Sequence, residues 1–232
     1  MQTLILCGGR GVRAYPATAD VPKPMLRIGD RPVLHHIMDI YARHGVTDFV
    51  LAAGYKREVI ESYADQWPAD WTVKVVDTGE ESDTGDRVIA CLDHVDDTFH
   101  ATYGDGVGNV DITAVAARHA GHGGGATVTV VPLPSQYGTL VTDDSGKVVD
   151  FREKPVLPDH LINAGFFVFD REPLAACAGP SLERDILPAL GARGELFVYR
   201  HEGFWKSMDT QKDVSDVDAL ARREDPPWLT AH

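Results

Sequence analysis

The sequence predicts an α/β fold, a Rossmann-like, mixed and mostly parallel sheet flanked by helices. Through residues 1–125, short apolar runs alternate with amphipathic segments, which is typical of parallel strands joined by helical crossovers. An apolar strand at 3–6 runs directly into a glycine-rich turn. After residue 126 short strands predominate, so antiparallel strands are expected there. We expect a single domain over 1–232 with two halves, 1–125 and 126–232.

In the first half, the opening run Thr-Leu-Ile-Leu reads as a buried strand, and Pro32 and Gly45 mark the start and the stop of the first long helix. The expected strands of this half are 3–6, 48–53, 73–77 and 98–103. The expected helices are 31–44, 56–66, 85–94 and 111–120. The glycine-rich stretch 121–125 then separates the two halves.

The second half contains more antiparallel β-structure and is expected to hold a second substrate. Alternating and apolar runs predict strands at 126–132, 138–142, 147–152, 161–169 and within 196–206. Helices are expected at 181–190 and 211–223.

Composition excludes several classes of protein. The chain has 232 residues and 44% hydrophobic content, enough for a full core, and its net charge of −13 disfavours nucleic acid as a partner. Cys7, Cys91 and Cys177 lack the pairing and spacing of a disulfide framework or a zinc site. No apolar run reaches membrane-spanning length and no leader precedes the first strand, so we expect no membrane partner and a cytoplasmic protein.

The glycine-rich turn indicates nucleotide chemistry. At Gly8, Gly9 and Gly11 bare backbone amides can close around an anion, and Arg13 and Lys23 place two cations where its phosphates would lie.

The known phosphate-binding fingerprints do not describe this turn. Its spacing formally satisfies G-x-G-x-x-G/A, but that motif needs a helix at the turn, which Pro16, Pro22 and Pro24 forbid. The Walker A pattern fails because no Lys-Ser or Lys-Thr pair closes the loop. What remains is a long, irregular, basic loop suited to a triphosphate.

Other polar loops follow apolar strands, and ligands of such sheets bind beyond the carboxyl ends of the strands. Residues 76–87 form a long polar linker. Asp105 lies between two glycines after one strand, and Asp209 follows another.

Taken together, these loops and further motifs resemble the sugar-1-phosphate nucleotidylyltransferases, and most of all their glucose-1-phosphate cytidylyltransferase branch. The resemblance covers nearly the whole chain and rests on the segments 8–13, 22–25, 76–79, 84–87, 102–107, 153–155, 162–167 and 203–210.

This resemblance implies attack of a sugar-1-phosphate oxygen on the α-phosphorus of a nucleoside triphosphate, with release of pyrophosphate. CTP and glucose-1-phosphate are the favoured pair. Another base (dTTP, UTP, GTP or ATP) and another sugar or cyclitol phosphate stay open, as does a homo-oligomer. The halves 1–125 and 126–232 then become the nucleotide-binding and sugar-phosphate-binding halves.

The resemblance also implies residue roles. Arg13 and Lys23 would stabilise charge on the phosphates, and Asp105 and Asp209 would hold Mg²⁺. The implied nucleotide contacts are Gly8, Gly9, Gly11, Thr78, Gly79, Thr84, Gly85, Arg87 and Gly104. The implied sugar-phosphate contacts are Gly138, Glu153, Lys154 and Asn163.

Some positions depart from the pattern of that branch. Val12 replaces a threonine, Val21 replaces a second lysine, Asp86 replaces a glycine, and the segment between Tyr55 and Asp77 is shorter. These departures bear on the base, the sugar and the oligomeric state.

Plainer interpretations stay open beside these. Asp105 could only cap a turn, and the basic residues could be solvated charges. His35, His36 and the aromatic pair 166–167 read as packing residues, as does Trp205. A metal-dependent glycosyltransferase would use Asp-x-Asp, which Gly104-Asp105-Gly106 lacks. A non-catalytic nucleotide sensor would have lost a catalytic cation or metal ligand.

Overall fold

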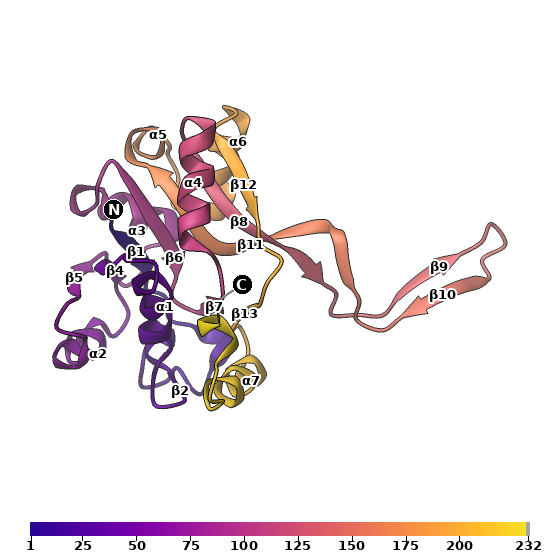
Figure 1. Cartoon of the computed structure of the whole chain (residues 1–232), viewed down its shortest axis with the longest axis horizontal. Coiled ribbons are helices and arrows are strands. Elements are labelled where there is room, and N and C mark those ends of the chain that lie inside the picture. Colours follow the sequence, from indigo (N-terminus) through magenta and orange to yellow (C-terminus); the bar gives the residue numbers. More distant parts are fainter. Residues whose placement is uncertain (231–232) are drawn as a thin grey trace.

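The computed structural model describes residues 1–230, apart from the side chain of Arg13. A seven-stranded sheet in the order β12-β8-β11-β6-β1-β4-β5 forms its centre (Figure 1). β11 is antiparallel to both of its neighbours, and the other adjacent pairs of this sheet are parallel. The sheet is therefore mixed and mostly parallel, which confirms the predicted fold class.

The strands of the central sheet are β1 (Thr3–Leu6), β4 (Asp48–Ala53), β5 (Thr72–Asp77), β6 (Thr98–Tyr103), β8 (Ala126–Pro134), β11 (Val156–Asp170) and β12 (Leu196–Arg200). Three two-stranded sheets pair β2 (Arg27–Ile28) with β3 (Arg31–Pro32), β7 (Gly106–Gly108) with β13 (Trp205–Ser207), and β9 (Thr139–Thr142) with β10 (Val148–Arg152). The α-helices are α1 (Val33–Ala42), α2 (Arg57–Glu61), α3 (Thr84–Ala90), α4 (Ile112–His122), α5 (Arg171–Ala175), α6 (Leu187–Ala192) and α7 (Gln211–Ala221).

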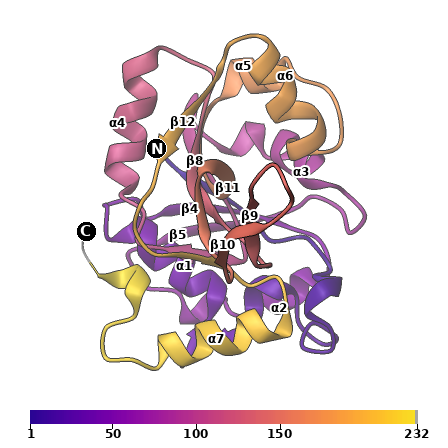
Figure 2. The same ribbon diagram turned by 90° about the vertical axis from the view of Figure 1, so that its right-hand side faces the viewer.

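Two hydrophobic cores cover the two faces of the sheet. Side chains of a strand alternate between faces, so Ile5 of β1 packs in one core and Leu4 in the other. The first core joins the sheet to α1, α4 and α7, and the second joins it to α3, α5 and α6. Figure 2 shows α7 on the opposite side of the body from α5 and α6. The apolar runs of the sequence are thus buried on both faces.

Most predicted elements are present, and several are divided. The helix expected at 56–66 is α2 followed by a 3₁₀ turn at Ala64–Gln66, and that at 85–94 is α3 followed by Leu92–His94. The helix expected at 181–190 begins as a π-turn, Leu182–Ile186, since Pro188 has no N–H for the usual ladder. The helix expected at 31–44 starts only at Val33, because residues 31–32 pair as β3.

The prolines of the first loop have the predicted effect. Only two single 3₁₀ turns form there, Val12–Ala14 and Lys23–Met25. His35 and His36 are buried, and the ring of His35 packs against two tryptophans, as expected of packing residues. In the described part of the chain, no helix has both the length and the apolar character needed to cross a bilayer.

A long two-stranded arm projects from this body (Figure 1). It consists of the outer parts of β8 and β11 and the hairpin of β9 and β10. Large apolar side chains on it are exposed, among them Leu140, Val141, Val149 and Phe151. A two-stranded ribbon of this kind has no core of its own.

Candidate functional site

The carboxyl ends of β1, β4, β5 and β6 meet at one edge of the sheet, because these strands are parallel and adjacent. The loops that leave them enclose a cavity of about 500 Å³, here called the first pocket. Its walls are formed by Leu6, Gly8, Gly9, Gly11, Val12, Lys23, Pro24, Ser82, Asp83, Thr84, Arg87, Tyr103, Gly104 and Asp105. This is the edge at which the sequence predicts a nucleotide.

The glycine turn forms one wall of the first pocket and needs its glycines. Gly11 adopts a left-handed conformation with φ of 60°, and its carbonyl accepts a hydrogen bond of 3.1 Å from the Thr18 hydroxyl. A Cβ atom on Gly8 would lie 2.0 Å from the Arg87 guanidinium. The turn is therefore held close to its neighbours with its backbone facing the cavity.

Arg87, in α3, holds the loops of the first pocket together. Its Nη1 donates to the Thr78 hydroxyl and the Gly79 carbonyl, each at 2.7 Å, and its Nη2 donates to the Gly8 carbonyl at 3.0 Å. The residue is only 3% exposed, and this burial lowers the pKa of the guanidinium. These hydrogen bonds tie the loops together, and Arg87 also lines the first pocket, so the nucleotide contact implied for it stays a prediction.

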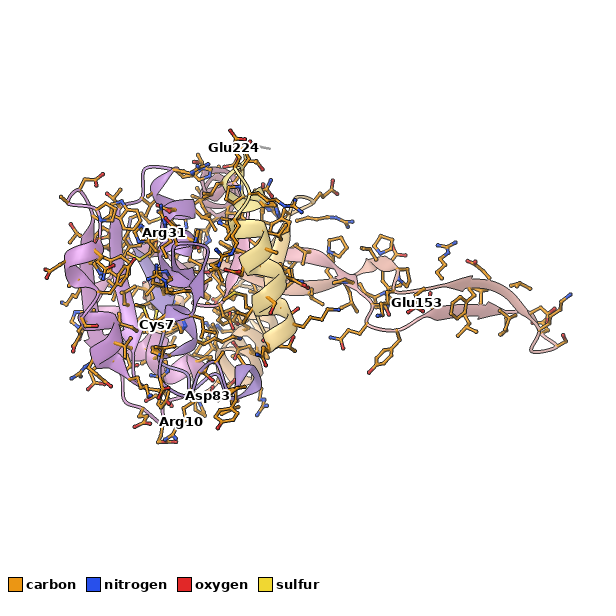
Figure 3. The ribbon with its side chains drawn as sticks, turned by 90° about the horizontal axis from the view of Figure 1, so that it is seen from below. Cys7, Arg10, Arg31, Asp83, Glu153 and Glu224 are labelled. Carbon is orange, nitrogen blue, oxygen red and sulfur yellow. The ribbon has the colours of Figure 1, made fainter. Side chains whose placement is uncertain are left out.

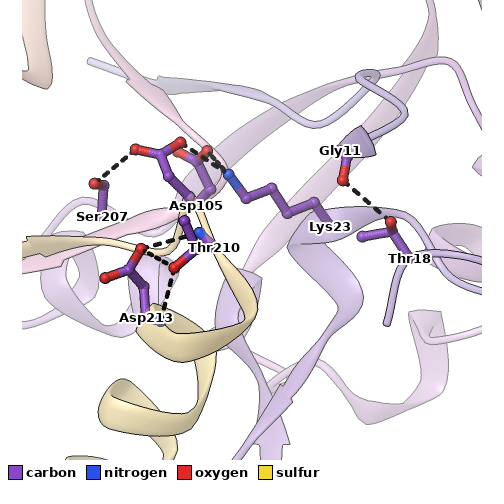
Figure 4. A network of polar contacts seen from close by, with 8 residues as sticks. Gly11, Thr18, Lys23, Asp105, Ser207, Thr210 and Asp213 are labelled. Atoms are coloured by element: carbon purple, nitrogen blue, oxygen red, sulfur yellow. Dashed lines mark hydrogen bonds and ion pairs between the residues drawn. The ribbon is translucent and has the colours of Figure 1, made fainter. Parts of the chain in front are cut away.

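The two predicted metal ligands both lie close to the Lys23 ammonium group. The Lys23 ammonium is 2.6 Å from Asp105 Oδ2 and 3.4 Å from Asp209 Oδ1 (Figure 4). The prolines around Lys23 hold it in a 3₁₀ turn, where the residue is 8% exposed. The Asp105 carbonyl accepts from Met208 N at 2.9 Å, and Ser207 Oγ donates to Asp209 Oδ2 at 3.0 Å. Residues far apart in the sequence thus form one charged cluster.

A second pocket of about 420 Å³ adjoins the first and shares Thr84, Tyr103 and Asp105 with it. Its walls are formed by Thr84, Thr102, Tyr103, Asp105, Gly106, Asn163, Ala164, Gly165, Glu183, Trp205, Ser207 and Asp209. Asp105, Asp209 and Glu183 are its three carboxylates. Trp205 lines this pocket as well as packing against the first core, and its indole N–H donates to the Ala164 carbonyl at 2.8 Å.

The pockets gather many of the predicted residues. Lys23, Asp105 and the pocket-lining members of the nucleotide set come together in the first pocket, and Asn163 and Asp209 lie in the second. The backbone of Arg13 lies in the 3₁₀ turn beside the first pocket, but its side chain is outside the described part.

Other predicted contacts lie elsewhere. Thr78 and Gly79 do not line the first pocket and accept hydrogen bonds from Arg87. Gly85 does not line it either, and its N–H donates to the Pro180 carbonyl at 2.7 Å. Gly138, Glu153 and Lys154 belong to the arm, and none of them is among the described residues that line either pocket. Figure 3 shows Glu153 out along the arm, away from the body. The sugar-side roles implied for these three residues stay predictions.

Sequence reasoning missed Glu183 and Tyr103. Tyr103 ends β6 and separates the pockets, and its hydroxyl donates to Glu183. Glu183 lies in the π-turn, far along the chain, and no motif of the sequence marks it. Tyr103 could have been noticed as the residue at the end of a strand, immediately before the predicted Gly104-Asp105 turn.

The comparisons with known proteins agree with this geometry. The family model described as nucleotidyl transferase matches residues 2–221. The chain belongs to the nucleotidyl transferase family. A glucose-1-phosphate cytidylyltransferase of Salmonella typhi is 36% identical, with 99% of each chain covered. A mannose-1-phosphate guanyltransferase of Debaryomyces hansenii is 33% identical over 97% of this chain and 67% of that protein.

Solved structures show the same nucleotidyltransferase fold. The crystal structure of HddC from Yersinia pseudotuberculosis matches with a TM-score of 0.73 at 22% identity, covering 94% of this chain and 98% of that one. At that identity the likeness concerns the fold. Together, the family and the fold confirm the resemblance drawn from the motifs.

Proposed function

We propose that this nucleotidyltransferase transfers a nucleotidyl group from a nucleoside triphosphate to a sugar-1-phosphate, with CTP and glucose-1-phosphate as the favoured pair. The single observation that carries the proposal is the pair of adjoining pockets that share Asp105. The relatives named as glucose-1-phosphate cytidylyltransferases, which match over almost the whole chain, support the choice of substrates.

In the proposed reaction, a phosphate oxygen of the sugar-1-phosphate bonds to the α-phosphorus of the triphosphate. The bond from that phosphorus to the leaving pyrophosphate breaks, so one phosphoanhydride is made as another is lost. Phosphate groups of like charge repel by several kcal/mol at close range, at an effective dielectric constant of about 20. The protein therefore has to neutralise and align them.

Residues of the first pocket fit this task. The glycine turn offers backbone N–H groups to the triphosphate, and Lys23 supplies a cation at the boundary with the second pocket. Arg13 is proposed as a second cation because it follows the glycine turn directly in the sequence. Arg87 lines the first pocket and holds the glycine turn and the 78–80 segment together through its hydrogen bonds.

We further propose that Asp105 and Asp209 hold Mg²⁺. Both are oxygen donors from different loops, and an ammonium group already lies within 3.4 Å of each, so the carboxylates face a position suited to a cation. Two carboxylates suit Mg²⁺, which keeps several waters. Bound there, Mg²⁺ would neutralise phosphate oxygens.

Pyrophosphate release tests the proposal. The protein is mixed with Mg²⁺, one of several nucleoside triphosphates, and one of several sugar-1-phosphates. Release that requires both substrates, and is fastest with CTP and glucose-1-phosphate, is the expected result. Release of nucleoside diphosphate from a nucleotide sugar would indicate a glycosyltransferase, and binding without turnover would indicate a sensor.

Asp105→Asn provides the matching variant. We expect turnover to fall by about 100-fold or more, because a charge at the shared wall of the pockets is lost. Asp216→Asn is the control, since Asp216 pairs with Lys206 and lines neither pocket. Equal rates for the two variants would contradict the role of Asp105.

A further inference from the structure

The charges of the second pocket restrict where a phosphate can lie in it. Three carboxylates line this pocket, whereas no lysine or arginine side chain in the described part of the chain does. A phosphate placed in this pocket away from Lys23 would meet carboxylates and no lining lysine or arginine side chain of the described part. Lys23 contacts the Asp105 and Asp209 part of the wall. A phosphorylated sugar therefore fits with its phosphate at that wall and its uncharged ring elsewhere in the pocket.

Glu183 forms a different part of the wall and is held rigidly. Its Oε1 accepts from the Tyr103 hydroxyl, and its Oε2 accepts from Thr84 Oγ1 at 2.7 Å and Ser181 Oγ at 3.2 Å. α3 and β6 thus contact it from outside its own turn, and Asn163 Nδ2 of β11 supports the Tyr103 hydroxyl by donating to it at 3.1 Å. Such a network fixes the direction of each polar group before a ligand arrives.

The donors on Glu183 are hydroxyl groups, and it has room for another. A carboxylate has about four acceptor positions, and three are used here by Tyr103, Thr84 and Ser181. The residue as a whole is exposed, at the mouth of a cavity. Asn163 lines the same cavity and is oriented by the Gly165 N–H, which donates to its Oδ1 at 2.8 Å. The Glu183 carboxylate can accept hydrogen bonds beside the oriented Asn163 side chain, an arrangement suited to adjacent hydroxyl groups of a sugar ring.

We infer that Glu183 is a specificity residue that accepts hydrogen bonds from ring hydroxyls of the sugar-1-phosphate. This inference rests on the proposed function and deepens it, because it assigns the ring end of that substrate.

Steady-state kinetics of Glu183→Gln test the inference. The substrates are CTP with glucose-1-phosphate and with its 2-, 3-, 4- and 6-deoxy derivatives. We expect the KM for glucose-1-phosphate to rise about 10-fold or more, because hydrogen bonds to a charged group are lost. The KM for CTP should stay within about 2-fold, the melting temperature should be retained, and discrimination against at least one deoxy sugar should shrink.

Glu195→Gln is the matched control, since Glu195 pairs with Arg193 on the surface and lines neither pocket. If Glu183 is purely structural, Glu183→Gln will raise the KM values for CTP and for glucose-1-phosphate together. The relative rates with the deoxy sugars will then stay as in the wild type. This result would overturn the inference and leave the proposed function intact. Wild-type protein that turns over no pair of substrates would instead overturn the proposed function, and the inference with it.

Discussion

At the scale of single residues, Lys23 shows how one ammonium group can join carboxylates from two different loops. Its ammonium group lies 2.6 Å from Asp105 Oδ2 and 3.4 Å from Asp209 Oδ1. Removing the ammonium group takes away a charge partner that these two carboxylates share. The stability of the protein without metal should therefore depend on this lysine.

We predict that Lys23→Met lowers the free energy of unfolding in metal-free buffer by about 1–3 kcal/mol. Millimolar Mg²⁺ should recover most of this loss, because the ion would compensate the same two carboxylates. Thermal unfolding with and without Mg²⁺ measures the effect.

Lys206→Met is the matched control, because Lys206 also bridges two carboxylates, Asp213 and Asp216, which line neither pocket. Mg²⁺ should not recover its loss of stability. The same Mg²⁺ response in both variants would refute the metal site.

His100, in the central strand β6, makes stability depend on pH. Burial lowers the pKa of this histidine from 6.5 to about 4. Between these values the unfolded chain binds more protons than the folded one, so the free energy of unfolding falls as the pH falls. The contribution is fully present above pH 6.5 and amounts to about 3 kcal/mol, lost by pH 4.

Urea unfolding at several pH values measures this dependence. His100→Gln should reduce the slope between pH 6.5 and 4. His160→Gln, a change on the exposed arm, should leave it unchanged. A slope unaffected by the His100 change would assign the acid sensitivity to other groups, such as His35, whose pKa burial also lowers to about 4.

At the scale of elements, α3 is tied to three strand ends by one side chain. Arg87 joins α3 to the carbonyl groups of Gly8, Ala53 and Gly79. The elements that frame the first pocket thus depend on a guanidinium with several donors in fixed directions.

We predict that Arg87→Lys lowers the free energy of unfolding by about 2–4 kcal/mol, because one ammonium group cannot satisfy these separated acceptors. Amide hydrogen exchange in residues 8–11 and 78–83 should become faster, and the KM for the triphosphate should rise. Arg57→Lys serves for comparison, since Arg57 pairs with Asp77 and Glu61 at the surface. Unchanged exchange in the two loops would argue against the clamp.

At the scale of the whole molecule, the arm contrasts with the packed body. The arm exposes apolar side chains on a ribbon that has no core of its own. The chain as a whole, in contrast, carries a net charge of −13. Exposed apolar surface of this extent is typical of a contact with another chain. A homo-oligomer, which the sequence leaves open, would cover this surface.

We predict that the purified protein is an oligomer and that replacing Leu140 and Val149 by lysine shifts it toward the monomer, because charge then opposes burial of the arm. Light scattering after size-exclusion chromatography measures the mass. Replacing Arg152 by lysine preserves the charge of the arm and should leave the mass unchanged. A wild-type monomer at micromolar concentration would contradict the prediction.

Local patterns in the sequence were enough to predict the class of the fold and the chemistry at one edge of the sheet. Apolar runs report burial directly, and glycine and proline restrict the backbone locally, so the strands, the irregular first loop and the Gly104-Asp105 turn were predictable. The motif resemblance then indicated the family that the comparisons confirm.

Which of the predicted residues meet depends on the packing of distant segments and could not be predicted from local pattern. Arg87 turns toward backbone carbonyls, and the arm carries Glu153 and Lys154 away from the pockets. Glu183 reaches Tyr103 and Thr84 from a segment that carries no motif. These outcomes depend on contacts between segments distant in sequence, and the direction of a side chain in such contacts is set by packing rather than by local pattern.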